Sequence, residues 1–104
     1  ILGPGFKEII YKDALEVELE REKIAYEREK SFRVLYDDLI LDRRFDVDFM
    51  VFNSIVLEIK AASIIHYENF RQTLNYLKAS EIKLGILINF GASKLEFQRI
   101  ICTY

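Results

Sequence analysis

Three residues carry side chains that could act together on a substrate: Asp48, Glu58 and Lys60. They lie in one stretch, residues 46–61, that reads as a β-hairpin because polar and apolar residues alternate, break at Asn53, and give way to a β-branched run. Two carboxylates facing each other on neighbouring strands, with Cβ atoms about 5 Å apart, repel unless a cation lies between them. Lys60 supplies one positive charge, and a divalent metal with oxygen ligands would supply another. A cross-strand charge network at the surface would account for the same spacing, so both interpretations stay open at this point.

The length of the hairpin loop decides whether these charges meet. A two-residue loop, Asn53-Ser54, would place Asp48 on the face opposite Glu58 and Lys60. A loop of three residues, 52–54, instead pairs apolar residues on one face: Val51 with Ile55, Phe49 with Leu57, and Val47 with Ile59. The other face then carries Asp48 opposite Glu58. Because a slip of one residue turns every side chain to the other face, burial favours the three-residue loop.

Two predicted helices flank this hairpin in the sequence. Helical spacing predicts the first over residues 6–23, with Glu8, Tyr11 and Leu15 on one strip. Its recurring apolar positions are Phe6, Ile9, Ile10, Ala14 and Val17. An acid at Glu8 would also suit the positive end of the helix dipole without any catalytic role. The second helix is predicted over residues 67–79, with Gln72 and Tyr76 on one flank and a buried stripe of Phe70, Thr73, Leu74 and Leu77.

The remaining segments predict strands. Residues 25–36 form a long edge strand, residues 39–41 a short one, and Arg43-Arg44 a solvated corner that could contact phosphate. Residues 84–88 are continuously apolar, which predicts a central strand parallel to a neighbour. Residues 94–101 form the last strand, with Leu95 and Phe97 pointing inward. The order predicts a mixed central sheet flanked by helices, in the α/β or α+β class, as one domain over residues 1–104.

Composition limits the function classes. The 104 residues are 51% hydrophobic and 31% charged, with a net charge of -2, so binding to nucleic acid would need a local basic patch. The single Cys102 rules out an intramolecular disulfide and a cysteine-based zinc site. No apolar run approaches the length of a membrane span, and no signal peptide is visible, so we expect a cytoplasmic protein without a membrane partner.

The residues around these acids are similar to a known family. The spacing Gly5-x-x-Glu8-x-x-Tyr11 and five segments resemble the GxxExxY proteins, a group within the PD-(D/E)XK nuclease superfamily. The segments are LGPGFKEIIYKDAL, FDVDFMV, LEIKA, QTLNYLKAS and KLGILINFGA. The resemblance covers nearly the whole chain. It implies a restriction-endonuclease-like core and a metal-dependent nuclease that hydrolyses phosphodiester bonds, in DNA rather than RNA.

The resemblance also implies roles for single residues. Asp48 and Glu58 would hold Mg²⁺, or Mn²⁺ in its place, together with the backbone carbonyl of Ile59. Lys60 would orient or deprotonate the attacking water and neutralise charge on the phosphate. Two helical residues, Glu8 as an outer metal ligand and Gln72, would complete the catalytic set. Mg²⁺ prefers oxygen ligands and commonly uses one or two carboxylates, and a partly desolvated lysine can titrate into a useful range.

The sequence departs from the family in two places, and other functions stay open. Members usually carry a further helical segment before LGPG, which we expect this domain to lack, so a dimer contact or the entrance to the site would be incomplete. The loop AASIIHYENF lacks the acidic residue and the histidine at the positions where members often carry them. The alternatives are an inactive nuclease-like fold that binds nucleic acid or protein, and a structural domain that forms oligomers such as a homodimer.

Overall fold

The computed structural model describes residues 5–92 and 94–103, so the start of the LGPG segment lies outside the described residues. Seven elements follow in chain order: α1 (Glu8–Arg21), β1 (Tyr26–Tyr36), β2 (Leu39–Val51), β3 (Ile55–Lys60), α2 (Tyr67–Ser80), β4 (Leu84–Asn89) and β5 (Glu96–Ile101). Both helices lie close to their predicted bounds. None of the helices in the described part of the chain is long and apolar enough to span a membrane.

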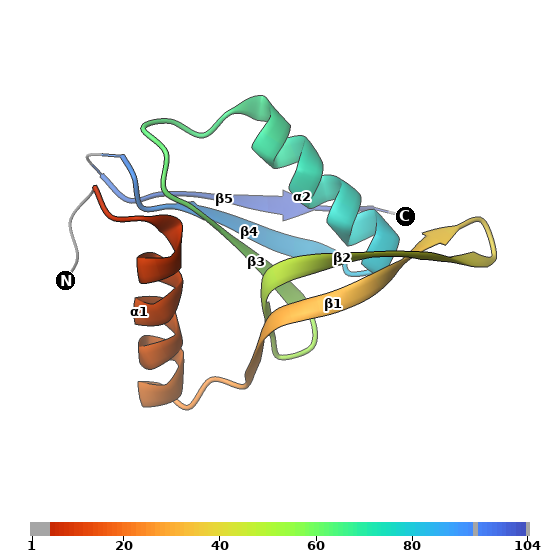
Figure 1. Ribbon diagram of the computed structural model, residues 1–104, viewed down its shortest axis with the longest axis horizontal. Helices are drawn as coiled ribbons and strands as arrows, with labels where there is room; N and C mark the ends of the chain where they lie inside the picture. Colours follow the sequence, from red (N-terminus) through yellow and green to blue (C-terminus); the bar gives the residue numbers. More distant parts are fainter. Residues whose placement is uncertain (1–4, 93, 104) are drawn as a thin grey trace.

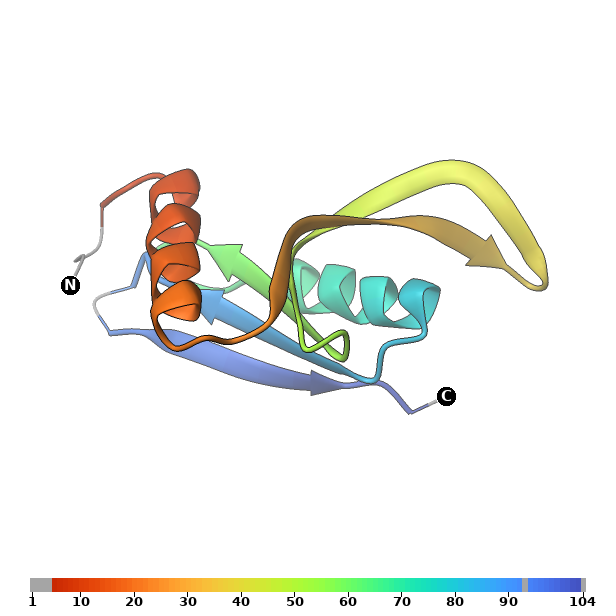
Figure 2. The ribbon, with the colours of Figure 1, turned by 90° about the horizontal axis from the view of Figure 1, so that it is seen from below.

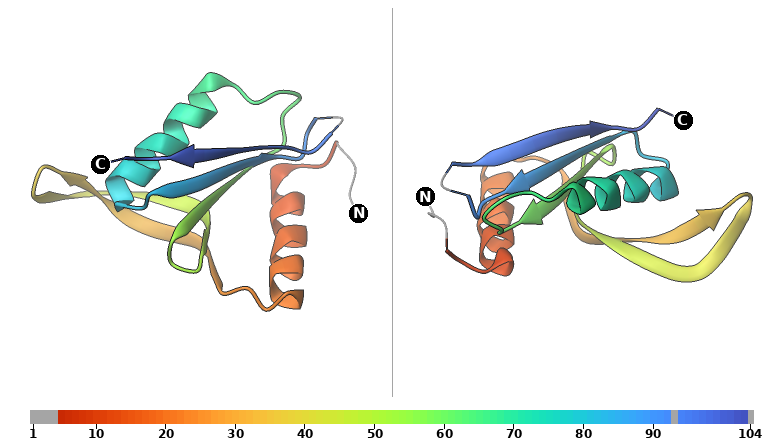
Figure 3. Two further views of the ribbon diagram at one scale, coloured as in Figure 1. Left: turned by 180° about the vertical axis from the view of Figure 1, so that it is seen from behind. Right: turned by 90° about the horizontal axis from the view of Figure 1, so that it is seen from above.

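The five strands form one mixed sheet in the order β1-β2-β3-β4-β5. β3 and β4 run parallel because α2 connects them, and every other neighbouring pair is antiparallel. In Figure 1 α2 lies above the strands and α1 stands at their left, and the right-hand view of Figure 3 has α2 in front of the sheet. The predicted mixed sheet flanked by helices, and the central position of β4, are therefore confirmed.

Each helix covers its own hydrophobic cluster. On one face Leu77 of α2 packs with Val47, Met50, Val56 and Leu87 of the strands. On the other face α1 contributes its buried residues, Tyr11 and Leu19, to a cluster with residues of β2 and β3: Phe49, Val51, Leu57 and Ile59. The predicted stripe of α2 is confirmed, since Thr73 and Leu77 are buried and Phe70 and Leu74 pack against the first cluster. The sheet between the clusters is thus covered on both faces where β3 runs.

The predicted apolar stripe of α1 is wrong. Phe6, Ile9, Ile10 and Val17 are exposed, and the helix turns the face of Tyr11, Leu15 and Leu19 toward the sheet. The stacked contact of Tyr11 with Phe90, at 4.9 Å between ring centroids, anchors this face. A large aromatic ring buries more apolar area than an isoleucine, so Tyr11 decides which side faces the core. The inward prediction for Leu95 and Phe97 is also wrong, since both are exposed and Ile100 is the buried residue of β5.

The two long strands β1 and β2 form an arm. β2 is continuous over Leu39–Val51, so the predicted short strand and the solvated corner at Arg43-Arg44 are parts of one strand. Figure 2 shows the far end of β1 and β2 extending beyond the end of α2. Phe32 and Phe45 pair across this arm and their rings stack at 5.6 Å, and the ring of Tyr76 stacks on Phe45 at 4.7 Å. The arm is therefore joined to α2 by aromatic contacts.

Asn89 fixes the chain just after β3. Its side chain is fully buried, and its amide nitrogen donates to the carbonyl of Ala62 and to Glu96 Oε1. Its amide oxygen accepts from the backbone N–H groups of Ala62 and Gly91. Gly91 has no room for a side chain, because a Cβ there would collide with the backbone of Ala62. These contacts set the path of the chain immediately after Lys60.

Replacing Asn89 with leucine should lower the free energy of unfolding by about 2–4 kcal/mol, because several buried backbone groups lose their partners at once. Urea unfolding measures the difference. The matched control is Asn75→Leu on the exposed face of α2, which should change stability little. An Asn89→Leu variant as stable as the wild type would show that water replaces these four hydrogen bonds.

Candidate functional site

The site forms where β2 and β3 separate. The predicted pairs Val51–Ile55 and Phe49–Leu57 are confirmed, but the pairing of the two strands ends there, so the predicted Val47–Ile59 pair is not made. Beyond that point the backbone N–H of Asp48 donates to Glu58 Oε2 at 2.7 Å. The backbone N–H of Ile59 donates to Asp48 Oδ2, also at 2.7 Å. Each strand thus holds the carboxylate of the other, and the two acids are fixed side by side.

The cation beside Asp48 comes from α1. The ammonium of Lys12 lies 2.7 Å from Asp48 Oδ1 and 3.2 Å from Glu29 Oε1. Burial opposes the charge on Lys12, but its hydrogen bonds and attraction to Asp48 and Glu29 outweigh burial and raise the pKa of Lys12. The sequence pattern predicts Lys60 as the partner of the acids and assigns no role to Lys12. The signal that could have found it is helical spacing, because Lys12 follows Glu8 by one turn on the same face.

Glu58 is the most perturbed acid of the site. Its side chain is buried, and burial together with the negative charge of Asp48 raises its pKa to about 8, against the hydrogen bond from Asp48 N–H and the charge of Lys60. Its second oxygen, Oε1, accepts no hydrogen bond from the described residues. Every fully enclosed side-chain oxygen in that part of the chain has a partner, so Oε1 is not completely enclosed, although Glu58 as a whole is buried. The pair therefore offers a second carboxyl group that loses its proton only as the pH rises toward 8 or when a cation offsets the repulsion.

Lys60 ends β3 beside these acids. It is half-buried and pairs with Asn89 in the ladder between β3 and β4. Its charge reaches Glu58, since it lowers the pKa of that carboxyl. Among the residues that the structure describes, Lys60 makes no ion pair. Its ammonium is therefore free to bind an anion next to the carboxylates.

The two helical residues of the predicted set lie differently. Glu8 is the first residue of α1 and is half-buried, one turn before Lys12, but it makes no ion pair or side-chain hydrogen bond with any described residue. Gln72 is exposed on α2 and lines a shallow depression of about 270 Å³ with Tyr76. No hydrogen bond joins Gln72 to Asp48 or Glu58 within residues 5–92 and 94–103. The structure brings together Asp48, Glu58, Ile59 and Lys60, and it leaves Glu8 and Gln72 at the margin.

Tyr76 of α2 lies near the acids, whereas the sequence predicts only its position on a flank of that helix. Burial raises the pKa of its hydroxyl, and so do the charges of Glu58, Asp48 and Asp46. Its ring is held on Phe45 of the arm. Tyr76 therefore brings α2 to the acidic cluster from the side opposite α1, and its spacing of four residues from Gln72 was the available signal.

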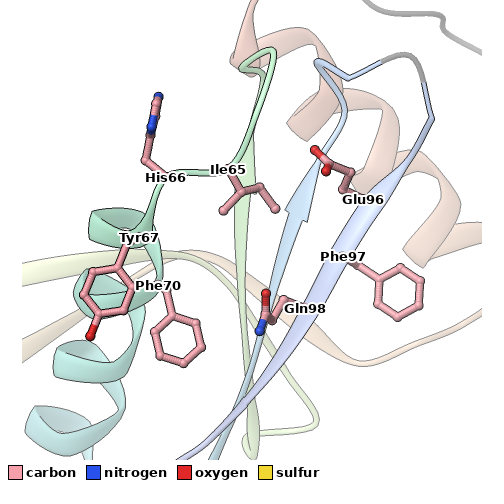
Figure 4. A pocket seen from close by; sticks show the side chains of 7 residues that line it. All are labelled: Ile65, His66, Tyr67, Phe70, Glu96, Phe97 and Gln98. Atoms are coloured by element: carbon pink, nitrogen blue, oxygen red, sulfur yellow. The ribbon is translucent and has the colours of Figure 1, made fainter.

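A separate cavity lies between α2 and β5. Its volume is about 450 Å³, and none of the predicted site residues lines it. In Figure 4 Ile65 and Phe70 turn toward this space, whereas the side chains of His66 and Phe97 point away from it. The chemistry suggested by the acids is therefore not located in this cavity.

Comparison with known proteins identifies the family of the chain. The sequence matches the PD-(D/E)XK nuclease superfamily over residues 1–100. The chain belongs to this superfamily. The five-stranded mixed sheet with two helices is compatible with the restriction-endonuclease-like fold of PD-(D/E)XK proteins. No curated protein matches the chain.

A solved structure has the same fold as this chain. The crystal structure of SSO0001 aligns with a TM-score of 0.72 and 20% sequence identity, over 91% of this chain and 50% of that chain. The chain thus spans about half the length of SSO0001. At this identity the likeness concerns the fold alone.

The donor set can be tested against the divalent metal that PD-(D/E)XK nucleases use. Among the described residues, no three His, Cys, Asp or Glu side chains form a metal-binding group. Mg²⁺ does not need three, because it keeps several waters and commonly takes one or two carboxylates plus substrate phosphate. The two adjacent carboxyl groups of Asp48 and Glu58, which a cation would allow to ionise together, suit such an ion. The residues present therefore fit a magnesium-type site.

Proposed function

We propose that the protein is a metal-dependent nuclease that hydrolyses phosphodiester bonds in DNA. The observation that carries this proposal is the pair of reciprocal hydrogen bonds between Asp48 and β3, which fixes two carboxylates side by side. Lys60 ends β3 beside them, and its ammonium makes no ion pair with any residue that the structure describes. Superfamily membership supports nuclease activity. The same arrangement has no evident use in a purely structural domain, because it keeps two acids close together at a cost in repulsion.

Each residue of the proposed site has a distinct task. Asp48 and Glu58 would hold Mg²⁺ or Mn²⁺ with the carbonyl oxygen of Ile59. When bound, such an ion lowers the pKa of a coordinated water and stabilises negative charge on the phosphate. Lys60 orients the attacking water and offsets charge on the scissile phosphate. Glu8 approaches from α1 as an outer ligand, and Gln72 with Tyr76 contacts substrate from α2.

A cleavage assay tests the proposal. The purified protein should nick or degrade at least one of four labelled substrates in Mg²⁺ or Mn²⁺: duplex DNA, single-stranded DNA, branched DNA and RNA. Cleavage should stop in EDTA, because the carboxylates alone cannot activate water. Asp48→Asn protein, purified in parallel, is the control for contaminating nucleases. Wild-type protein that cleaves none of these substrates would contradict nuclease activity, and cleavage of RNA alone would contradict the assignment to DNA.

Three further predictions accompany this function and await their own measurements. The chain is expected to act as a single domain over residues 1–104, in the cytoplasm, and as a homodimer when it grips a duplex. Sedimentation with and without DNA would measure the last of these. A monomer on duplex DNA would contradict the dimer.

A further inference from the structure

The ammonium of Lys12 has two carboxylate acceptors of different character. Asp48 Oδ1 lies 2.7 Å away and belongs to a side chain that is 14% exposed. Glu29 Oε1 lies 3.2 Å away and belongs to a side chain that is 49% exposed. Lys12 itself is 13% exposed. Its charge therefore bridges the enclosed site and the solvent-facing edge of β1.

Glu29 is held in this place by an unusual backbone conformation. Its φ angle is +54°, in the left-handed region that residues with a side chain seldom adopt. The neighbouring pairs Arg28–Phe49 and Lys30–Val47 keep their register, so Glu29 lies across from Asp48 without pairing with it. Such conformations persist where the surrounding structure imposes them and are frequent at functional sites. The irregular point of β1 therefore lies directly beside the acid that the proposed metal needs.

Lys12 and a divalent cation compete for the same oxygen. Asp48 Oδ2 accepts from the N–H of Ile59, and Oδ1 is the oxygen in contact with Lys12, so a metal that uses Oδ1 meets this ammonium. Two cations on one carboxylate oxygen repel strongly in a poorly solvated site. A metal that binds Asp48 through Oδ1 must therefore displace the ammonium. Glu29 is already within reach to receive it.

We propose that Lys12 takes the place of the metal on Asp48 in the cation-free protein and moves onto Glu29 when a divalent cation binds. Lys12 and Glu29 are then positioning residues with opposite effects: Lys12 lowers the affinity of the site for the metal, and Glu29 raises it. Lys12 protects the paired acids from repulsion while no metal is present, and Glu29 lowers the cost of releasing Lys12. This inference rests on the proposed metal site, but not on cleavage of any substrate.

Calorimetric titration with Mn²⁺, without nucleic acid, tests the inference. Lys12→Met should tighten Mn²⁺ binding about tenfold, because the competing charge is gone. Glu29→Gln should weaken Mn²⁺ binding about tenfold, because displaced Lys12 then lacks its second acceptor. The double variant should bind like Lys12→Met, since Glu29 acts only through Lys12. A merely structural role for the two residues would weaken binding in both single variants.

Matched controls separate these effects from general changes in charge. Glu27→Gln alters an acid of β1 with the same 49% exposure, and Lys7→Met alters an exposed lysine beside α1. Both should leave Mn²⁺ affinity unchanged. Lys12→Gln serves in place of Lys12→Met if circular dichroism shows that the methionine variant does not fold.

The outcomes distinguish this inference from the proposed function. Wild-type protein that binds Mn²⁺ but cleaves no nucleic acid would contradict nuclease activity. It would not contradict the exchange of Lys12 from Asp48 to Glu29. Wild-type protein that binds Mn²⁺ and cleaves DNA, with no gain in affinity for Lys12→Met, would overturn the exchange alone. Absence of Mn²⁺ binding in both the wild type and Lys12→Met would overturn both.

Discussion

Replacing Lys60 with methionine should lower the rate of DNA cleavage by about two to three orders of magnitude while leaving Mn²⁺ binding intact. The charge of Lys60 reaches Glu58, and its ammonium makes no ion pair in the described part of the chain, so it is available to a bound phosphate. Removing that charge should leave the carboxylates able to hold a metal. The loss should therefore appear in kcat rather than in metal affinity.

Two comparisons make the Lys60 experiment specific. Asp48→Asn should lose both Mn²⁺ binding and cleavage, because it removes a proposed ligand, whereas Lys60→Met should lose cleavage alone. Lys83→Met, at an exposed lysine just before β4, is the matched control and should cleave like the wild type. Undiminished cleavage by Lys60→Met would remove Lys60 from the mechanism and leave the metal as the source of the attacking hydroxide.

The hairpin shows how much of this site can be read from sequence. Its loop length and the pairs Val51–Ile55 and Phe49–Leu57 follow from burial, because only one register puts apolar residues opposite one another. The end of the ladder does not follow from that rule. Asp48 and Glu58 accept hydrogen bonds from the opposite strands, and these bonds replace the ladder bonds that alternation alone would continue. Side-chain acceptors of this kind change the course of a strand without changing its apolar pattern.

The helix α1 shows where sequence reasoning stops. Apolar residues occur on two of its sides, so helical spacing alone cannot decide which side packs on the sheet. The structure buries Tyr11 and Leu19, and this rotation brings Lys12 to Asp48. The contact depends on how a helix sits across a sheet, and sequence separation of 36 positions gives no local sign of it. Choosing the side with the large aromatic residue would have predicted the buried face and placed Lys12 beside it, but not the contact of Lys12 with Asp48.

Glu58→Gln should make the cation-free protein more stable than the wild type at high pH. Between pH 5 and pH 9 the difference in the free energy of unfolding between the variant and the wild type should grow by an amount on the order of 3–5 kcal/mol. In the folded protein burial and the charge of Asp48 raise the pKa of Glu58 to about 8, from an ordinary value of 4.5. A raised pKa means that the folded state holds its proton longer than the unfolded state does. The stability that Glu58 contributes is therefore complete below about pH 4.5 and is lost as the pH rises toward 8.

Urea unfolding in EDTA at pH 5, 7 and 9 measures how stability depends on the protonation of Glu58. The difference between Glu58→Gln and the wild type separates the effect of Glu58 from that of other titrating groups. Glutamine keeps an oxygen that can accept from the N–H of Asp48, so the variant removes the charge and little else. Glu68→Gln, at an exposed acid of α2, should have the same free energy of unfolding as the wild type at every pH.

Saturating Mn²⁺ should restore the stability of the wild type at pH 9 but should not raise that of Glu58→Gln, because only the ionised pair binds the metal tightly. A wild-type curve as flat as that of the variant would mean that the paired acids carry no excess charge, and the site would then have no electrostatic reason to bind a divalent cation.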